Sequence, residues 1–374
     1  MEVGIATCDT SRQELDTSKF VHDPDLVIYF GNGDFLTHGV AQINKFAPEA
    51  VVLGCTSGGQ IQNDTSIESQ FSAASIKFSS TRVKAAKCEI RDSQSSKAAG
   101  QEIGRQLASE DLACVIIISD GLATNGSELA SGISAELGPN TVVVGGLAGD
   151  GDRFEKTLVG FGDDLQTNMV VAVGLYGKDL NVSHGSRGGW QTFGPKRLVT
   201  RSQDNILYEL DGHPVLDLYE KYLGDDAAGL PSTALLFPLQ IVDPDVPGSE
   251  VVRTILNIDR EKKSLIFAGN IPHGWVAQFM NASHHNLIEG ATMAAKDAAK
   301  ERSDGELAIL ISCIGRKLVM NQRAEEEVEV VSDILNGIPQ IGFYSYGELC
   351  PSEKGGKTRL HNQTMTITVL SEKV

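Results

Sequence analysis

Short apolar runs recur along the chain, each followed by a glycine-containing turn and then by a segment with helical spacing. Leu26–Phe30 is the first run and predicts a buried strand, because its apolar residues lie between turn signals. We expect a helix over about Leu36–Phe46, a second strand over Val51–Leu53 and a third over about Phe71–Phe78. The polar residues before Asp25 predict an irregular segment.

The same order of elements occurs again further along the chain. Cys114–Ile118 predicts a strand, Glu128–Leu137 a helix, Val142–Val144 a second strand and Met169–Leu175 a closing strand. A glycine-rich stretch follows the second strand in both places, so the pattern predicts an internal duplication. Two such copies are expected to share one sheet through right-handed crossovers.

The C-terminal region contains a third version of this order. Strands are expected over Leu307–Ser312, Pro339–Phe343 and Thr364–Leu370, with a turn at Cys313–Arg316 and a helix over about Gln322–Leu335. Apolar side chains of that helix fall on one stripe at i, i+4, i+7 and i+11. Asn336-Gly337 is the expected C-cap, because both residue types tolerate a left-handed backbone.

The region between the second and third versions has a different pattern. Residues 205–222 predict a helix, Val251–Ile258 and Ser264–Phe267 a hairpin, and Trp275–Met280 a strand. An alanine-rich helix is expected over Ser283–Lys300, with Ser283 as its N-cap. We therefore predict an α/β fold of two domains, residues 1–204 and 205–374, built from repeated strand-helix-strand units with mixed sheets.

Composition excludes several classes of protein. The 374 residues are 41% hydrophobic and 22% charged, which is typical of a globular chain. A formal net charge of −17 argues against binding to nucleic acid or to an anionic membrane surface. No secretory signal or run of about 20 apolar residues is visible, so a cytoplasmic location is expected. The six cysteines form no C-x-x-C pair, which argues against the usual zinc spacings.

Several motifs in this order resemble those of the FIST N and FIST C sensory domains. The first 204 residues resemble FIST N through Gly54–Gly59 and Gly145–Gly151. A longer series of motifs, beginning at Val199-Thr200, resembles FIST C. These motifs are Val199-Thr200, Leu210-Asp211-Gly212, Arg253-Thr254, Ala268–Pro272, Ser312–Arg316, Gly342–Glu348 and His361–Thr364.

The resemblance implies a sensory module of intracellular signal transduction that binds a small ligand such as an amino acid. Some bacterial proteins of similar architecture bind haem, sense nitric oxide and report to a histidine kinase, so haem is a possible cofactor. No kinase, cyclase or methyl-accepting segment is visible in this sequence. Signalling is therefore expected to pass through a separate partner such as a histidine kinase.

Charged residues near the motif turns are the main ligand-binding candidates. Arg253 and Arg316 follow or lie within apolar strands, where a guanidinium must find an anion. The anion is either a ligand carboxylate or an internal acid, for Arg316 an acid such as Glu325 or Glu348. Asp150 and Glu348 follow glycine turns and are candidates for a ligand ammonium group. Turn capping and internal ion pairs are the alternative roles for these carboxylates.

The other candidates surround the glycine turns. Gly54, Cys55 and Thr56 begin a turn whose backbone N–H groups are candidate ligand contacts, although the stretch lacks the lysine of a P-loop. Positive backbone angles in a tight turn explain the glycines equally well.

Cys313, His361 and Asn362 complete the candidate binding set, and His361 is also explained as a hydrogen-bonding residue at a strand end. Cys55 and Cys313 are the only nucleophiles considered, and a buried structural thiol is the more frequent outcome for each. We expect a binding protein and no enzyme, with a cysteine-dependent enzyme as the alternative. The expected site is a cleft between the domains, lined by equivalent turns from each.

Overall fold

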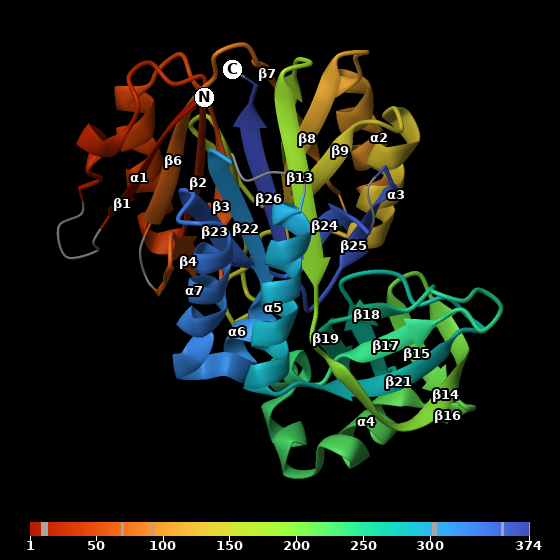
Figure 1. Cartoon of the computed structure of the whole chain (residues 1–374). Helices are drawn as coiled ribbons and strands as arrows, with labels where there is room; N and C mark the ends of the chain where they lie inside the picture. The colour runs from red at the N-terminus through yellow and green to blue at the C-terminus, as the bar shows by residue number, and fades with distance from the viewer. Residues whose placement is uncertain (9–13, 69–70, 92, 301–304, 353–354, 374) are drawn as a thin grey trace.

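The strands of the protein form three six-stranded sheets in one body and an eight-stranded sheet in a separate lobe (Figure 1). The computed structural model describes residues 1–8, 14–68, 71–91, 93–300, 305–352 and 355–373. All four sheets lie within these ranges and helices cover them, so the predicted mixed α/β fold is confirmed.

Each sheet of the body is built on one unit with a common order of elements: an outer strand, a strand, a helix, a parallel strand, a hairpin and a closing strand. Unit 1 contains β1 (Glu2–Cys8), β2 (Leu26–Gly31), α1 (Gly33–Phe46), β3 (Val51–Thr56), β4 (Gln60–Gln62), β5 (Thr65–Ile67) and β6 (Phe71–Lys77). Unit 2 contains β7 (Arg82–Glu89), α2 (Ser96–Leu107), β8 (Leu112–Ser119), α3 (Gly126–Glu136), β9 (Val142–Leu147), β10 (Val159–Phe161), β11 (Asp164–Gln166) and β12 (Met169–Tyr176). Unit 3 contains β13 (Leu180–Arg187), α5 (His284–Ala299), β22 (Leu307–Cys313), α6 (Ile314–Met320), α7 (Ala324–Ile334), β23 (Gln340–Ser345), β24 (Gly347–Pro351), β25 (Thr358–His361) and β26 (Met365–Glu372).

The repeat predicted from the sequence therefore occurs three times. The pairs β2–β3, β8–β9 and β22–β23 are each parallel. The closing strands β6, β12 and β26 pair antiparallel with β2, β8 and β22, the first strands of these pairs. The N-terminal copies do not share one sheet, so that expectation was wrong. Each copy forms the centre of its own sheet because its second parallel strand is bordered by a hairpin from another unit.

The hairpins are exchanged between the three units in a closed cycle. The β4–β5 hairpin of unit 1 pairs with β23 of unit 3, and the β24–β25 hairpin of unit 3 pairs with β9 of unit 2. The β10–β11 hairpin of unit 2 returns to β3 of unit 1. Each sheet is therefore completed by a neighbour, and no unit has a complete sheet of its own.

Three equivalent backbone hydrogen bonds link the exit turns, which we define as residues 56–59, 147–151 and 344–347. Gly58 N–H donates to Tyr344 O at 2.9 Å, and Tyr346 N–H donates to Leu147 O at 3.1 Å. Gly149 N–H donates to Thr56 O at 3.1 Å and closes the ring. In each turn the donor follows the acceptor by two residues, so the three turns have the same local geometry.

One glycine in each second parallel strand permits the close approach of its partner strand. A Cβ atom on Gly54 would lie 2.0 Å from Tyr29 O, and one on Gly342 would lie 1.9 Å from Leu310 O. A Cβ atom on Gly145 would lie 1.8 Å from Ile117 O of β8. Glycine is required at these three equivalent positions because any side chain would overlap the neighbouring backbone.

The inner faces of the three sheets meet in one apolar core. Side chains of β2, β8 and β22 alternate, so that Ile28 and Ile116 point inward while Tyr29 and Ile117 belong to clusters under the helices. Phe30 stacks on Phe343 at a centroid distance of 4.5 Å and joins units 1 and 3. Strands buried on both faces explain the nearly continuous apolar runs in the sequence.

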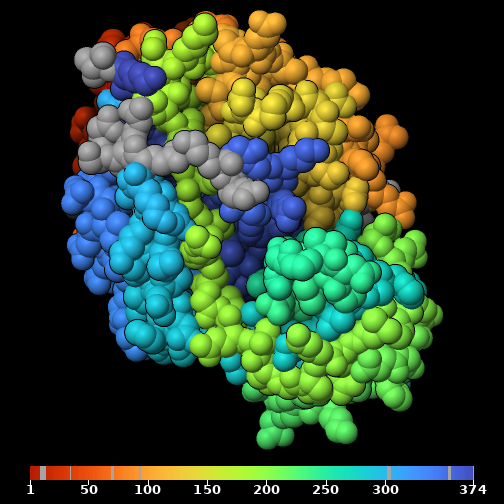
Figure 2. All heavy atoms as spheres, turned by 45° about the vertical axis from the view of Figure 1, so that its right-hand side comes forward, coloured from red at the N-terminus to blue at the C-terminus, as the bar shows by residue number. Residues whose placement is uncertain are grey.

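The lobe is inserted into unit 3 between β13 and α5, and Figure 2 shows it as a separate green and cyan mass beside the body. It contains α4 (Val215–Leu223) and the strands of the fourth sheet. These are β14 (Gln191–Gln203), β15 (Ile206–Leu210), β16 (His213–Pro214), β17 (Leu239–Val242), β18 (Val251–Arg253), β19 (Ile255–Asp259), β20 (Ser264–Phe267) and β21 (Val276–Asn281). The predicted domain boundary near residue 204 lies in the turn between β14 and β15.

Several predicted segments differ from the structure, and one of them, the turn expected at Cys313–Arg316, contains the start of α6. Residues 2–8 form β1, whose buried positions carry glycine, alanine and cysteine and therefore give little apolar signal; residues 9–13 of that predicted irregular stretch lie outside the described residues. Residues 205–222 form two strands before α4, because Asp211 and Gly212 adopt positive φ angles of 52° and 78° and turn the chain. The Asn336-Gly337 C-cap is confirmed by φ angles of 54° and 72°.

Replacing Gly342 with alanine is expected to destabilise the protein by about 3 kcal/mol, because β22 and β23 must separate to admit the new methyl group. Gly138→Ala is the matched control, since no atom lies within 4 Å of its added Cβ, and a change within about 0.5 kcal/mol is expected. Urea denaturation measures both. Equal stability of the two variants would contradict the close-approach explanation.

Candidate functional site

A pocket of about 230 Å³ lies where the exit turns of units 1 and 2 meet α6 of unit 3. Ser57, Gly58 and Gly59 line it from unit 1, and Asp150–Arg153 line it from unit 2. Ile314 and Lys317 of α6 form the third side. This glycine-turn pocket lies at the carboxyl ends of parallel strands, which is where open α/β sheets commonly hold ligands.

Lys317 is a cation on the wall of this pocket, fixed there by several contacts. Its Nζ donates to Gly58 O at 2.9 Å, lies 3.1 Å from Glu68 Oε1 and sits over the Tyr344 ring at 5.1 Å from the centroid. The Lys317 side chain is 11% exposed, whereas that of Glu68 is 77% exposed. The ammonium group is thus held in place on its buried side, and the carboxylate opposite it is largely in solvent.

Other charged side chains line the same pocket with both signs. Arg153 and Asp152 are exposed and follow the glycine turn of unit 2. The backbone oxygen of Asp152 accepts a hydrogen bond from Ser232 Oγ of the lobe at 2.8 Å. The pocket therefore presents cations and anions to one small volume, beside a loop that contacts the lobe.

The glycine-turn residues predicted to bind a ligand have mainly structural contacts. Gly54 is the close-approach glycine of β3, and burial raises the pKa of the Cys55 thiol. Thr56 Oγ1 accepts from Leu158 N–H at 2.9 Å. The backbone N–H groups of residues 56–58 donate to protein carbonyl oxygens, so these donors are not directed at the pocket.

Asp150 caps the turn that follows it. Its carboxylate accepts from the backbone N–H groups of Phe154, Glu155 and Lys156 at 2.9–3.1 Å. It also accepts from Tyr346 Oη, which joins the exit turns of units 2 and 3. The turn-capping alternative therefore describes Asp150, and its oxygen atoms are occupied by the protein.

Arg316 forms an internal ion pair with a different acid from those expected. Its Nε and Nη2 lie 3.0 and 2.8 Å from Glu327 Oε2, and both side chains have 0% exposure. Nη2 also donates to Leu287 O at 2.8 Å, and Nη1 donates to Gly188 O. Of the two roles expected for Arg316, the structure shows the internal ion pair, with Glu327 in place of Glu325 or Glu348. The guanidinium points away from the pocket and is surrounded by acceptors of unit 3 and the chain entering the lobe.

Arg253 lies at the junction of the lobe with unit 2. Its guanidinium donates to Asn270 O at 3.1 Å, Leu360 O at 3.3 Å and Ser127 Oγ at 3.3 Å. Burial and the nearby Arg359 charge lower the pKa of Arg253 to about 10. No acidic side chain among the described residues pairs with it, and neutral carbonyl oxygens satisfy the cation instead.

Among the polar residues His361–Thr364, Asn362 and Gln363 contact the lobe, whereas His361 and Thr364 contact β24 of the body. His361 Nε2 lies 3.0 Å from Cys350 O, and burial lowers the pKa of His361 to about 4. Asn362 Oδ1 accepts from Thr254 N–H of the lobe at 3.3 Å. Gln363 Nε2 donates to Leu235 O at 2.9 Å. These residues therefore make contacts at the junction and do not line the glycine-turn pocket.

Glu348 and Cys313 are buried between this junction and the exit turns. Glu348 accepts from Ser345 Oγ at 2.7 Å and from Thr364 N–H and Oγ1 at 3.1 and 2.9 Å. Burial raises the pKa of Glu348 to about 7, because the ionised carboxylate is kept from solvent and no cation bonds to it. Burial and the Glu348 charge also raise the pKa of the Cys313 thiol.

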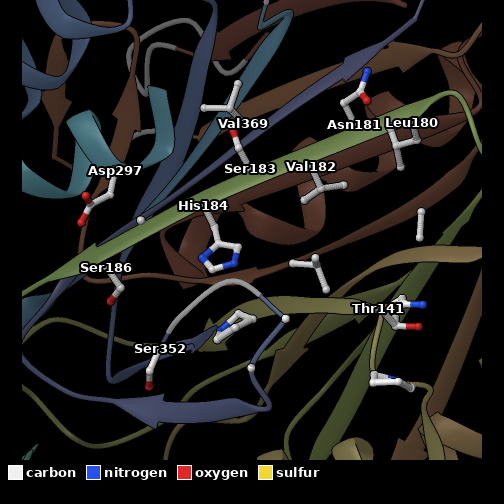
Figure 3. A pocket seen from close by; sticks show the side chains of 18 of the residues that line it. Thr141, Leu180, Asn181, Val182, Ser183, His184, Ser186, Asp297, Ser352 and Val369 are labelled. Atoms are coloured by element: carbon white, nitrogen blue, oxygen red, sulfur yellow. The ribbon is translucent and has the colours of Figure 1, made fainter. Parts of the chain in front are cut away.

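A second cavity, of about 850 Å³, follows β13 on the opposite side of unit 3 (Figure 3). His184 lies on its wall, with Nδ1 3.5 Å from Cys350 Sγ. Asn140, Asn181, Ser183, Ser186, Arg187 and Asp297 also line it. A haem macrocycle requires largely apolar walls, so these polar residues do not fit that cofactor. Among the described residues, no group of three or more His, Cys, Asp or Glu side chains is arranged to hold a metal ion.

Sequence reasoning selected Arg316 and missed Lys317, the next residue. Successive helical residues point about 100° apart, so the start of α6 directs Arg316 into the core and Lys317 towards the glycine turns. The stretch was expected to be a turn rather than a helix, so the directions of the two side chains could not be predicted from the 100° rotation. A helix assignment beginning at Ile314 identifies the outward cation.

Glu348→Gln is expected to make stability less dependent on pH between about 4.5 and 7. The native Glu348 retains a proton in that window and an unfolded carboxyl does not, so wild-type stability falls as pH rises, by on the order of 3 kcal/mol. His361 acts in the opposite direction, since its native pKa is depressed. The difference between the two proteins in chemical denaturation at pH 5, 6, 7 and 8 therefore isolates Glu348. Parallel curves would contradict a carboxyl that titrates near neutrality.

None of the helices in the described part of the chain is long and apolar enough to cross a membrane. Similar proteins include an uncharacterized protein of Mycobacterium tuberculosis, 26% identical over 98% of both chains, and one of Mycobacterium bovis, 28% identical over 62% of this chain and 61% of the relative. Another, from Methanocaldococcus jannaschii, is 22% identical over 86% of this chain and 68% of its own length.

Two solved cyanuric acid hydrolase structures align with the whole chain. One is from A. caulinodans, with 8% identity and a TM-score of 0.37, and the other has 11% identity and a TM-score of 0.31. Each alignment covers 100% of this chain and 99% of the hydrolase. These scores are too low to support an inference about fold or activity.

Two family matches account for most of the sequence. Residues 25–213 match the FIST N domain and residues 216–351 match the FIST C domain. The junction of the two matches lies in the lobe, between β16 and α4. Together the matches show that the chain belongs to the FIST family, whose domains are generally sensory, small-ligand-binding domains of signal transduction.

Proposed function

We propose that this chain senses a small carboxylate-bearing molecule, such as an amino acid, which binds in the glycine-turn pocket. The volume of about 230 Å³ suits a molecule of that size. Exit turns of the FIST N domain and α6 of the FIST C domain both line the pocket. A ligand there contacts both domains at once, which is what a sensor needs if binding is to change their relative arrangement.

The observation that carries the proposal is the position of Lys317. Gly58 O and the Tyr344 ring hold its ammonium group at the pocket wall, while its carboxylate partner Glu68 is mostly exposed. An ion pair with one solvent-exposed partner contributes at most about 1 kcal/mol. A ligand carboxylate can therefore replace Glu68 at little cost and gain a preplaced cation.

The ammonium group of an amino acid requires an anion in the same pocket. Asp152 is exposed and lines it, and its backbone oxygen contacts Ser232 of the lobe. A ligand held between Lys317 and Asp152 acts on the loop that touches the lobe. We propose that this loop carries the signal to the lobe and then to a separate protein, for which a histidine kinase is one candidate.

We propose binding without catalysis. The two thiols considered as nucleophiles, Cys55 and Cys313, have 0% exposure, and burial raises the pKa of each. A thiolate is the reactive species, and desolvation disfavours it. The polar cavity beside His184 equally gives no support to a haem-based nitric oxide sensor.

A thermal-shift screen of the amino acids and of their des-amino carboxylates tests the proposal. A ligand at 100 times its dissociation constant stabilises the protein by about 2.7 kcal/mol. Lys317→Met is expected to weaken binding of any active compound at least tenfold, measured by calorimetry, because it removes the cation and keeps the apolar stem. Asp152→Asn is expected to weaken amino acids and to leave des-amino carboxylates unchanged.

Lys263→Met is the matched control, since that lysine pairs with Asp217 on the lobe and lies outside the pocket. Its binding constant is expected to equal that of the wild type. Two results would overturn the proposal: no compound in the panel shifts the melting temperature, or Lys317→Met binds the active compound as well as Lys263→Met does.

A further inference from the structure

The unit 2 wall of the glycine-turn pocket carries two charged side chains that have no partner in the protein. Asp152 and Arg153 both line the pocket and are exposed. Neither side chain forms a hydrogen bond or an ion pair with any of the described residues. Asp150 of the same turn differs, because backbone N–H groups and Tyr346 occupy its carboxylate. One guanidinium and one carboxylate on this wall are therefore available to a bound molecule.

Arg153 extends from a loop whose backbone is fixed. The Asp150 carboxylate accepts from the N–H groups of residues 154–156 at 2.9–3.1 Å, directly after Arg153. Gly151 has a φ of 82° and turns the chain before it. A Cβ atom on Gly151 would lie 3.9 Å from Arg153 Nη1, so the guanidinium lies near the turn that forms the pocket wall. The cation is thus placed beside the pocket by the fold of the loop.

Lys317 is fixed on another side of the same pocket. Its Nζ donates to Gly58 O at 2.9 Å, and a Cβ atom on Gly59 would lie 2.4 Å from that Nζ. The turns of units 1 and 2 touch, since a Cβ atom on Gly149 would lie 3.4 Å from Gly58 N. The pocket therefore has two cations from different units, each held beside one of two adjoining turns.

The charged groups that a ligand can reach define what complements them. Lys317 and Arg153 supply two positive charges, and Asp152 supplies one negative charge. Glu68 is 77% exposed, so a ligand carboxylate can replace it beside Lys317. A molecule with two carboxylates and one ammonium group complements these three side chains, whereas an amino acid with a neutral side chain leaves one cation without an anion.

We infer that the glycine-turn pocket selects an acidic amino acid and that Arg153 binds its second carboxylate. This inference rests on the proposed function, in which Lys317 binds one carboxylate and Asp152 the ammonium group. A guanidinium offers two parallel N–H donors that match the two oxygen atoms of a carboxylate. Arg153 is therefore the residue that distinguishes an acidic amino acid from its amide.

The backbone around the pocket favours two carboxylates over a single phosphate group. Phosphate sites in proteins combine cations with several backbone N–H groups that point at the ligand. The N–H groups of residues 56–58 donate to carbonyl oxygens of the protein, and those of residues 154–156 donate to Asp150. These donors are consequently occupied, and side chains are left to supply the binding groups.

Calorimetry of the full chain with aspartate, glutamate, asparagine, glutamine and alanine tests the inference. Either aspartate or glutamate is expected to bind at least about tenfold more tightly than its own amide, because the amide keeps the shape and loses the charge. The better of the two acids identifies the spacing between the carboxylates. Inorganic phosphate is the additional probe for a phosphate site.

Arg153→Gln gives the matching change on the protein. It is expected to bring the affinities for the acid and its amide within about twofold of each other, with binding of alanine unchanged. Lys156→Gln is the matched control, since this exposed lysine belongs to the same loop and does not line the pocket. The control is expected to retain the preference for the acid, and both variants are expected to melt at the wild-type temperature.

Three results would overturn the inference and leave the proposed function standing or replace it. Equal binding of the acids and their amides removes the second carboxylate, and so does a preference for the acid that persists in Arg153→Gln. Either result is compatible with a sensor of neutral amino acids. Inorganic phosphate that displaces the acids, and that neither Lys317→Met nor Arg153→Gln binds, identifies a phosphate site instead. A panel in which no compound binds overturns the proposed function as well.

Discussion

The three backbone hydrogen bonds between the exit turns hold the rest of the molecule in register. They join Thr56, Leu147 and Tyr344 as acceptors at equivalent places in the three units. Each turn leads into a hairpin that pairs with the sheet of another unit, so the ring also determines which sheet each hairpin completes. Because backbone groups make these bonds, the sequence around them is free to differ, provided that the close-approach glycines remain.

The ring also explains why the charged motif residues are mainly structural. Asp150, Glu348 and Tyr346 lie beside it, where every polar group must find a partner inside the protein. The buried guanidinium of Arg316 likewise has its partner inside the protein, the carboxylate of Glu327. Lys317 lines the pocket instead, with its ammonium group over the Tyr344 ring and 11% of its side chain exposed. Its position makes it available to a ligand in a way that the buried charges are not.

The fold could be predicted from local patterns, whereas the site depended on contacts between distant residues. Apolar runs such as Cys114–Ile118 and the repeated glycines identify the three units, because buried strands and close approaches impose those residues directly. The three-residue strand β4 pairs with residues about 280 positions away, and no local signal indicates that partner. Likewise, the direction of Lys317 depends on where α6 begins, which composition alone does not determine.

The exchange of hairpins has a consequence for how the chain reaches its native state. β26 ends the described chain, yet it pairs with both β13 and β22, and β24 must arrive before β9 has its second neighbour. The sheets of units 2 and 3 consequently stay incomplete until β24, β25 and β26 have been synthesised, and long-range pairing of this kind is slow. Assembly of the three units is therefore expected to be one late, cooperative event, during which the nascent chain depends on protection from aggregation.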